Sequence, residues 1–186
     1  MIKRTFDALL AGVGLVLFAP LWVLIAAAIR VQDGGPILFR QDRVGRGGRL
    51  FTALKFRSMI VDADAITGPR QAQRHDRRVT PVGRVLRATA MDELPQLWNI
   101  FRGDMSFVGP RPLRPGEIEV SGDGRLVRLE QLPGYDERHR IRPGLTGVTQ
   151  VYAARDVPLV EKFRLDLQYA ERASVWFDLK LILLSF

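Results

Sequence analysis

Two adjacent carboxylates, Asp92 and Glu93, are the residues of this sequence best suited to do chemistry. Because Pro95 is tolerated only in the first turn of a helix, we expect a helix that begins near Asp92 and runs to about Phe101. Both carboxylates would then lie at the helix N-terminus, where unpaired N–H groups and the helix dipole favour anions and where a phosphate can bind. An acidic pair in this position is commonly only a cap, so the pair alone does not establish catalysis.

Arginines on both sides of the pair point to an anionic ligand. Arg84 and Arg87 precede it, and Arg111 stands between Pro110 and Pro112. An arginine held by flanking prolines loses less conformational freedom when it binds an anion. A solvated arginine in a surface turn would have the same sequence, so both interpretations stay open at this point.

Composition narrows the class of site. The chain has no cysteine, which excludes disulfides and thiolate metal sites, and two isolated histidines cannot form a His-rich zinc site. Metal binding through carboxylates stays open. Of the 28 basic residues 24 are Arg, which suits phosphate chemistry, although a GC-rich genome gives the same bias. Residues 1–89 carry a net charge of +9 and residues 90–186 carry −1, so the basic excess lies beside an apolar segment, as an anionic membrane surface would favour.

The apolar segment is the uncharged run from Ala8 to Ile29, which is long enough to span a bilayer as a helix. Basic residues flank it on both sides, with Lys3 and Arg4 before it and Arg30 after it, which favours keeping both ends in the cytoplasm. Pro20 bends or breaks a helix within the run. These features fit a re-entrant helix that returns to the same face of the membrane, while a kinked spanning helix stays open. A signal peptide fits less well.

The elements that must position these residues are short. We expect strands at 36–40 and 50–59 joined by a plain hairpin turn at 42–48, since the glycines there match neither a dinucleotide fingerprint nor a P-loop. Residues 61–79 read as a loop or short helix, and 122–124 as a turn. Further helices are expected at 81–87 and 158–169, the second with Val160, Phe163, Leu167 and Ala170 on one face. Ser174 would cap a last apolar helix, which suits either the membrane interface or the core.

These blocks together resemble the signature of the bacterial sugar transferase family, the monotopic phosphoglycosyl transferases. The resemblance covers nearly the whole chain and is most specific where Asp92-Glu93-Leu94-Pro95-Gln96 combines with Gly109-Pro110-Arg111-Pro112. The other matching blocks are Lys3 to Asp7, Pro36 to Gly45, Lys55 to Met59, Arg142 to Gly147, and Asp178 to Lys180.

The resemblance implies an α+β fold that is mainly helical with a small β element. Residues 1–31 would form a re-entrant membrane helix broken at Pro20, and residues 32–186 a catalytic domain that rests on amphipathic interfacial helices. The location would be the cytoplasmic face of the bacterial inner membrane. The implied reaction moves a sugar 1-phosphate from a nucleotide diphosphate-sugar, with uridine as the suggested nucleoside, to polyprenyl (undecaprenyl) phosphate. It would depend on Mg²⁺ and pass through a covalent intermediate.

Carried over by position, Asp92 resembles the nucleophile and Glu93 the metal-associated carboxylate, so both would lie at the metal. Arg87 and Arg111 resemble arginines that contact substrate phosphate, and Lys55 and Arg142 are weaker candidates for the same role. The sequence departs from the family pattern at Ala19-Pro20, at 147–150 and at 152–155, which bears on the substrate more than on the reaction type. The chain also ends without the basic tail often seen in the family, as a shortened chain would.

Two rival functions are weaker. A membrane-anchored nucleic-acid-binding protein would use the Arg-rich stretch 70–87, but few aromatic residues are interleaved there, so we expect no nucleic-acid partner. A catalytically inactive scaffold of the same family is disfavoured by the intact pair of Asp92 and Glu93.

Overall fold

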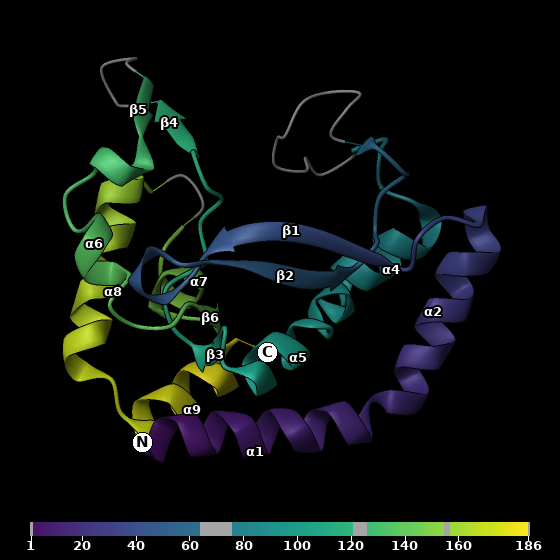
Figure 1. Ribbon diagram of the computed structural model, residues 1–186, viewed down its shortest axis with the longest axis horizontal. Coiled ribbons are helices and arrows are strands. Elements are labelled where there is room, and N and C mark those ends of the chain that lie inside the picture. The colour runs from purple at the N-terminus through teal and green to yellow at the C-terminus, as the bar shows by residue number, and fades with distance from the viewer. Residues whose placement is uncertain (1, 64–75, 121–125, 155–156, 186) are drawn as a thin grey trace.

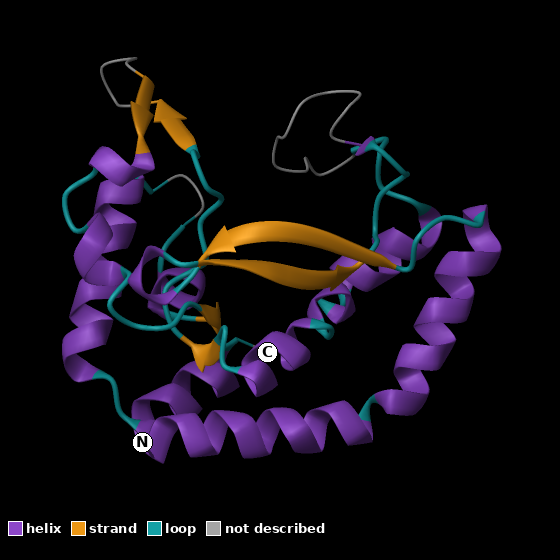
Figure 2. Ribbon diagram, viewed as in Figure 1, coloured by secondary structure: helices purple, strands orange, loops and turns teal. Residues whose placement is uncertain are grey.

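Figure 1 shows the computed structural model of the chain, which describes residues 2–63, 76–120, 126–154 and 157–185. The N-terminal half contains α1 (Ile2–Leu17), α2 (Ala19–Asp33), β1 (Leu38–Val44), η1 (Arg46–Gly48), β2 (Leu50–Phe56), α4 (Pro81–Ala88) and η2 (Met91–Glu93). The rest of the chain contains α5 (Gln96–Arg102), β3 (Ser106–Val108), β4 (Ile118–Val120), β5 (Leu126–Arg128), η3 (Leu129–Gln131), α6 (Tyr135–Arg138), β6 (Gly144–Thr146), α7 (Val148–Tyr152), α8 (Leu159–Arg172) and α9 (Val175–Leu184). The expected α+β class with a small β element is confirmed, since the described residues combine helices with three separate two-stranded sheets, of which the pair β4 and β5 projects from the body (Figure 2).

The apolar N-terminal run folds as two helices, α1 and α2, bent by 60° at Phe18. Pro20 lies in the first turn of α2, where its missing N–H ends the ladder of α1. Within the described residues no one helix has both the length and the apolar composition of a membrane span, whereas the bent pair reaches both together, by those two criteria alone. Large apolar side chains are exposed along the pair, among them those of Ile2, Leu9, Val13, Val16, Leu17, Val23, Leu24 and Val31. The break near Pro20 is therefore confirmed, and re-entry stays a prediction.

The strands β1 and β2 form an antiparallel hairpin that lies across the middle of the molecule (Figure 1). The expected hairpin turn is confirmed, although β1 extends to Val44 and β2 ends at Phe56, before the predicted Met59. The reason is Arg57, whose buried guanidinium pairs with Asp33 and donates to Pro36 O at 2.6 Å and Met59 O at 3.1 Å. These bonds turn the chain out of the strand and fix the end of α2 beside the hairpin. The expected loop at 61–79 lies mostly outside the described residues, and the turn at 122–124 lies wholly outside them.

Helix α4 matches the predicted span, and two features of the sequence fix its start. Thr80 accepts a hydrogen bond from Gly83 N at 3.0 Å, and Pro81 occupies the first turn. Gly83 lies directly against the main chain of Ser58, and a Cβ at this position would overlap the carbonyl oxygen of Ser58. This contact holds α4 against the end of the hairpin.

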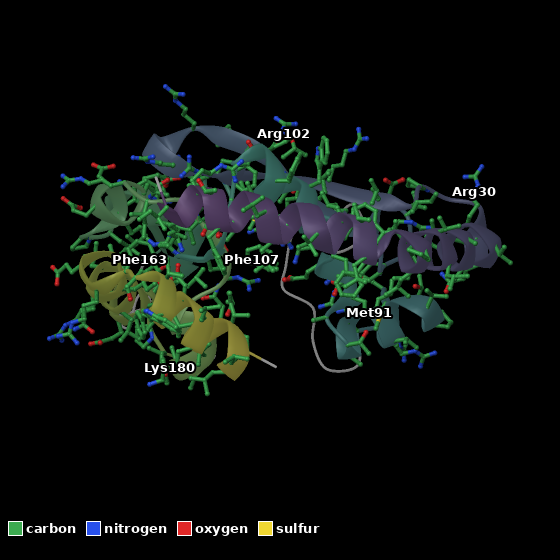
Figure 3. The ribbon with its side chains drawn as sticks, turned by 90° about the horizontal axis from the view of Figure 1, so that it is seen from below. Arg30, Met91, Arg102, Phe107, Phe163 and Lys180 are labelled. Carbon is green, nitrogen blue, oxygen red and sulfur yellow. The ribbon has the colours of Figure 1, made fainter. Side chains whose placement is uncertain are left out.

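Polar side chains join α1 to β3 and to the C-terminal helices. Asp7 of α1 accepts hydrogen bonds from Ser106 Oγ at 2.8 Å and Phe107 N at 3.3 Å, so α1 crosses the body beside Phe107 (Figure 3). Asp178 of α9 pairs with Lys3 and accepts from Tyr169 Oη at 2.6 Å. The contact between the N-terminal helix α1 and the C-terminal helix α9 therefore includes an ion pair.

Helix α8 buries the predicted face only in part, since Phe163 is buried and Leu167 and Ala170 are half-buried. The buried residues are Phe163, Asp166 and Tyr169, whereas Val160 is exposed. The prediction missed Asp166 because its burial depends on an ion pair with Arg138 from a distant segment. For α9, the cap by Ser174 is confirmed, with Phe177 N donating to its Oγ at 3.2 Å.

The two open alternatives for α9 turn out to describe its two faces. Leu181 is fully buried in the core, while Trp176 and Leu183 on the other side are 81% and 77% exposed. The helix thus combines a core face with an exposed apolar face.

Gly83 gives the first testable prediction. Gly83→Ala should lower stability by about 1–3 kcal/mol, because the new methyl group meets main-chain atoms that cannot rotate away. Gly12→Ala is the matched control: this helical glycine has only the Phe101 ring at 3.4 Å, so alanine should be tolerated or stabilise through helix propensity. Thermal unfolding of the purified chain in neutral detergent, followed by circular dichroism, measures both. Equal melting temperatures for the two variants would contradict the packing of α4 on Ser58.

Candidate active site

Asp92 and Glu93 lie in the 3₁₀ turn η2, and not in the first turn of an α-helix as we predicted. Pro95 explains the difference, because it has no N–H to bond Met91 O and so ends the turn before α5 begins at Gln96. Ala90, just before the pair, has a φ of 54° in the left-handed region, which costs about 1 kcal/mol for a residue with a Cβ. The pair therefore projects from a tight, strained turn between α4 and α5.

The turn is anchored by Asn99 of α5. Its side-chain amide accepts from Leu54 N at 3.0 Å and donates to Thr52 O at 2.8 Å, so it binds the edge of β2 as a neighbouring strand would. Met91, labelled in Figure 3, packs into an apolar cluster formed by α2, α4 and β2. These contacts set the pair opposite the side chains of β2.

Lys55 and Arg87 supply the positive charge around the pair. Lys55 of β2 forms an ion pair with Glu93 across the site. Burial raises the pKa of Asp92 above its ordinary value, while the charge of Lys55 lowers it, the charge of Glu93 raises it, and that of Arg87 lowers it. The structure thus brings together four of the six predicted site residues.

Arg43 of β1 is a site residue that sequence reasoning missed. Its pKa is lowered to about 10, first by burial and then by the charges of Arg114 and Arg111, while Glu117 and Glu93 act in the opposite direction. In the hairpin register, Arg43 opposes Phe51 and Lys55 opposes Phe39, so Arg43 and Lys55 share one face. The sequence reasoning missed it because Arg43 fell in the predicted turn at 42–48, whereas β1 extends to Val44 and so places Arg43 on the strand.

Arg111 adds a further positive charge, and hydrogen bonds hold the backbone on which it stands. Its carbonyl oxygen accepts from Arg138 Nη2 at 3.0 Å. The neighbouring carbonyl groups are also bonded: Pro110 O accepts from Gly144 N at 2.9 Å, Pro112 O from Arg43 Nη1 at 3.0 Å and Leu113 O from Val44 N at 2.9 Å. The main chain is therefore held on both sides, and the exposed guanidinium of Arg111 projects from a fixed segment.

Two buried features support this segment. Arg138 forms an ion pair with Asp166 at 2.7 Å, and both side chains are almost fully buried. Gly109, which precedes Pro110 and Arg111, lies so close to Gly144 that a Cβ on either glycine would overlap the main chain of the other segment. The two Gly- and Pro-containing motifs of the sequence are thus packed against each other along β3 and β6, which pair in parallel.

Arg142 is a predicted site residue that the structure places away from the carboxylate pair. It donates from Nε to Gly103 O at 2.9 Å, and its charged neighbours are Arg46, Arg4 and Asp7. The Asp92 and Glu93 pair is not among these neighbours. The motif that contains Arg142 packs on the Arg111 segment through the main chain, while the side chain of Arg142 points to a different part of the molecule.

The pair fits a magnesium ion that takes most of its ligands from substrate and water. In the part of the chain that the structure describes, no three His, Asp or Glu residues gather as a metal cluster. Mg²⁺ commonly binds through one or two carboxylates together with substrate phosphates, and Asp92 with Glu93 offers that set. The two adjacent negative charges, one of them with a raised pKa, also favour a cation.

Comparison with known proteins identifies the family of the chain. The model of the bacterial sugar transferase family matches residues 1–186. The chain is 46% identical, over 97% of its length, to the UDP-glucose:undecaprenyl-phosphate glucose-1-phosphate transferase of Caulobacter vibrioides, of which it spans 67%. It is 42% identical, over 98% of its length, to the undecaprenyl-phosphate glucose phosphotransferase of Komagataeibacter xylinus, of which it spans 35%.

A third relative acts on a different sugar. The UDP-N-acetylgalactosamine-undecaprenyl-phosphate N-acetylgalactosaminephosphotransferase of Aeromonas hydrophila is 39% identical over 97% of the chain, which spans 42% of that protein. The chain thus spans less than half the length of two of these three relatives. Because the family match runs through the carboxylate pair, the hairpin and the Arg111 segment alike, the chain belongs to the bacterial sugar transferase family.

Proposed function

We propose that the chain transfers a sugar 1-phosphate from a uridine diphosphate-sugar to undecaprenyl phosphate, with Asp92 as the nucleophile. The observation that carries the proposal is the setting of Asp92, a largely buried carboxylate beside Glu93 and opposite the charges of Lys55 and Arg87. The names of the relatives supply the donor and acceptor classes. Since they include both glucose and N-acetylgalactosamine transferases, the proposal covers UDP-sugars as a class.

The reaction divides into two displacements at one phosphorus atom. An oxygen of the Asp92 carboxylate attacks the phosphorus that bears the sugar, and the bond to the bridging oxygen breaks, so uridine monophosphate leaves with the electron pair. The sugar phosphoryl group is then joined to Asp92. A phosphate oxygen of the lipid attacks the same phosphorus, and the Asp92 carboxylate is regenerated. Neither step needs a protein base, because both nucleophiles are already anions.

The basic residues allow these anions to meet. Lys55 neutralises Glu93 and faces the position where the diphosphate must lie, and Arg43 with Arg111 extends positive charge from the same face of the hairpin. Guanidinium groups bind phosphate oxygens in pairs, which suits a diphosphate. Mg²⁺ held by Asp92 and Glu93 would neutralise further charge on the diphosphate and on the leaving group.

Membrane attachment would bring the acceptor to the site. The bent pair of α1 and α2 is proposed to be re-entrant, with the catalytic domain on the cytoplasmic face of the inner membrane. Exposed apolar side chains on α5 (Trp98, Phe101) and α9 (Trp176, Leu183) support an interfacial position. The phosphate of a membrane lipid then lies at the depth of the site, which reduces the entropic part of the barrier.

The covalent step gives the central prediction. Wild-type chain mixed with UDP-glucose or UDP-N-acetylgalactosamine and Mg²⁺, without lipid acceptor, should release about one equivalent of uridine monophosphate per chain. After rapid quenching and digestion with trypsin, the peptide from Ala88 to Arg102, which contains Asp92, should gain the mass of one sugar phosphate. Release that strictly requires the lipid, with no modified peptide, would leave Asp92 only a metal ligand.

The variant Asp92→Asn separates chemistry from folding. Both the release and the peptide mass gain should vanish, while the matched control Asp136→Asn, at an exposed carboxylate of α6, should keep them. Because burial raises the pKa of Asp92 in the folded state, its ionised form opposes folding at neutral pH, and a neutral Asn removes that cost. Thermal unfolding in EDTA should therefore give a melting temperature at or above that of wild type. A lower melting temperature would show that the buried charge is stabilising.

The charge of Lys55 gives a pH prediction. Lys55 lowers the pKa of Asp92, so Lys55→Met should raise that pKa further and reduce the ionised fraction at acidic pH. The acid limb of the pH profile for uridine monophosphate release, at fixed Mg²⁺, should move to higher pH. Arg87→Met should move it in the same direction by less, and Lys180→Met should not move it. An unmoved limb in Lys55→Met would mean that Lys55 acts on the substrate alone.

Topology is testable because the chain has no native cysteine. Single cysteines at Ile2 and at Arg49, both exposed, should react with a charged maleimide from the cytoplasmic side of oriented membranes. A cysteine at Phe18, at the bend, should react from neither side if the bend lies within the bilayer. Labelling of position 2 from the periplasm alone would establish a spanning helix instead.

A further inference from the structure

A cavity of about 200 Å³ lies between the start of α1, the hairpin connection η1 and the loop before β6. Its charged lining comes from Lys3, Arg46, Arg140 and Arg142, with Asp7 as the carboxylate. Neither member of the carboxylate pair lines this cavity, and neither Lys55 nor Arg87 does. It is therefore a separate feature from the proposed active site, and it accounts for the place that the structure gives to Arg142.

The charges around the cavity do not balance. Lys3 is paired with Asp178, and Asp7 accepts from Ser106 and from the main chain of Phe107. Among the ion pairs of the described residues, none involves Arg46 or Arg142.

The arginines are held close together all the same. Arg46 donates from Nε to Arg140 O at 2.9 Å, and Arg142 from Nε to Gly103 O at 2.9 Å. Burial lowers the pKa of Arg142, and the charges of Arg46 and Arg4 lower it further. An anion bound between the guanidinium groups would relieve this repulsion.

Ser106 and Tyr169 also line the cavity, and the remaining lining is apolar, which narrows the kind of anion. Val108, Ile141 and Ala173 contribute hydrocarbon surface beside the arginines. The elements at the cavity also carry exposed apolar side chains, since Ile2 of α1 is 79% exposed and Trp176, three residues after Ala173, is 81% exposed. A small hydrated anion would use only the charges, whereas an amphiphilic anion would use both parts of the lining.

We propose that this cavity binds the phosphate headgroup of an anionic lipid, with Arg46, Arg140 and Arg142 directed at the phosphate. The apolar walls and the neighbouring side chains of α1 and α9 would contact the start of the lipid chains. Such a site would fix the N-terminal end of α1 and the start of α9 to the membrane surface. It does not depend on the proposed reaction, because its ligand need not be a substrate.

The test uses a thiol placed in the cavity of the full chain in neutral detergent micelles. Ala173 is exposed and lines the cavity, so Ala173→Cys should be tolerated, and its reaction rate with a charged maleimide can be measured. Phosphatidylglycerol added to the micelles should slow the reaction about tenfold, whereas net-neutral phosphatidylcholine and inorganic phosphate should not. Glu171→Cys, an exposed position of α8 outside the cavity, should be slowed by none of them.

A second substitution tests the arginines. Arg46→Gln in the Ala173→Cys chain should remove the protection, because the new side chain carries no charge, while Arg49→Gln removes an equal charge from the same hairpin connection and should leave it intact. Equal loss in both variants would reduce the effect to general surface charge and overturn the site. Protection by inorganic phosphate equal to that by the lipid would overturn the lipid assignment. Stronger protection by polyprenyl phosphate than by phosphatidylglycerol would support the site and identify the acceptor lipid as its ligand.

Discussion

The position of the carboxylate pair depends on one side-chain amide, that of Asn99. It is 1% exposed, and it binds Leu54 N and Thr52 O at the edge of β2 as the main chain of a further strand would. Because η2 immediately precedes α5, this anchor fixes where Glu93 meets Lys55 across the hairpin. A slip of α5 by one strand residue, about 3.3 Å, would separate that ion pair while leaving every helix intact.

The two sides of the site are held by different means. The carboxylate side depends on one side chain and on a strained turn at Ala90, whereas the Arg111 side depends on hydrogen bonds to consecutive main-chain carbonyl groups, two of them donated by the side chains of Arg138 and Arg43. The second arrangement immobilises the backbone but leaves the guanidinium of Arg111 exposed. An arginine with an immobilised backbone and an exposed guanidinium group can bind a diphosphate and release a monophosphate with little reordering of the chain.

Features with a local signal were predictable from the sequence, and features set by distant contacts were not. Ser174 marked the start of α9, because a cap acts within a few residues, and α4 was predicted from its own short segment. The burial of Asp166 and the separate location of Arg142 depend on partners far away in the chain, namely Arg138 and the α1 segment. Arg43 lies between these cases, since strand parity places it on the same face as Lys55 only once β1 is known to extend to Val44.

The charge balance at Asp92 explains why this site needs both its cations and its burial. Burial and the adjacent Glu93 raise the pKa of Asp92, while Lys55 and Arg87 lower it, so the cations offset part of the cost of holding an ionised carboxylate away from water. A weakly solvated carboxylate is the stronger nucleophile. A diphosphate that enters the site competes for the same lysine and arginines and would raise the pKa of Asp92 again. The positive charge of the chain is then shared between two carboxylates and the donor, and this shortage is the physical reason for including Mg²⁺ in the proposed reaction.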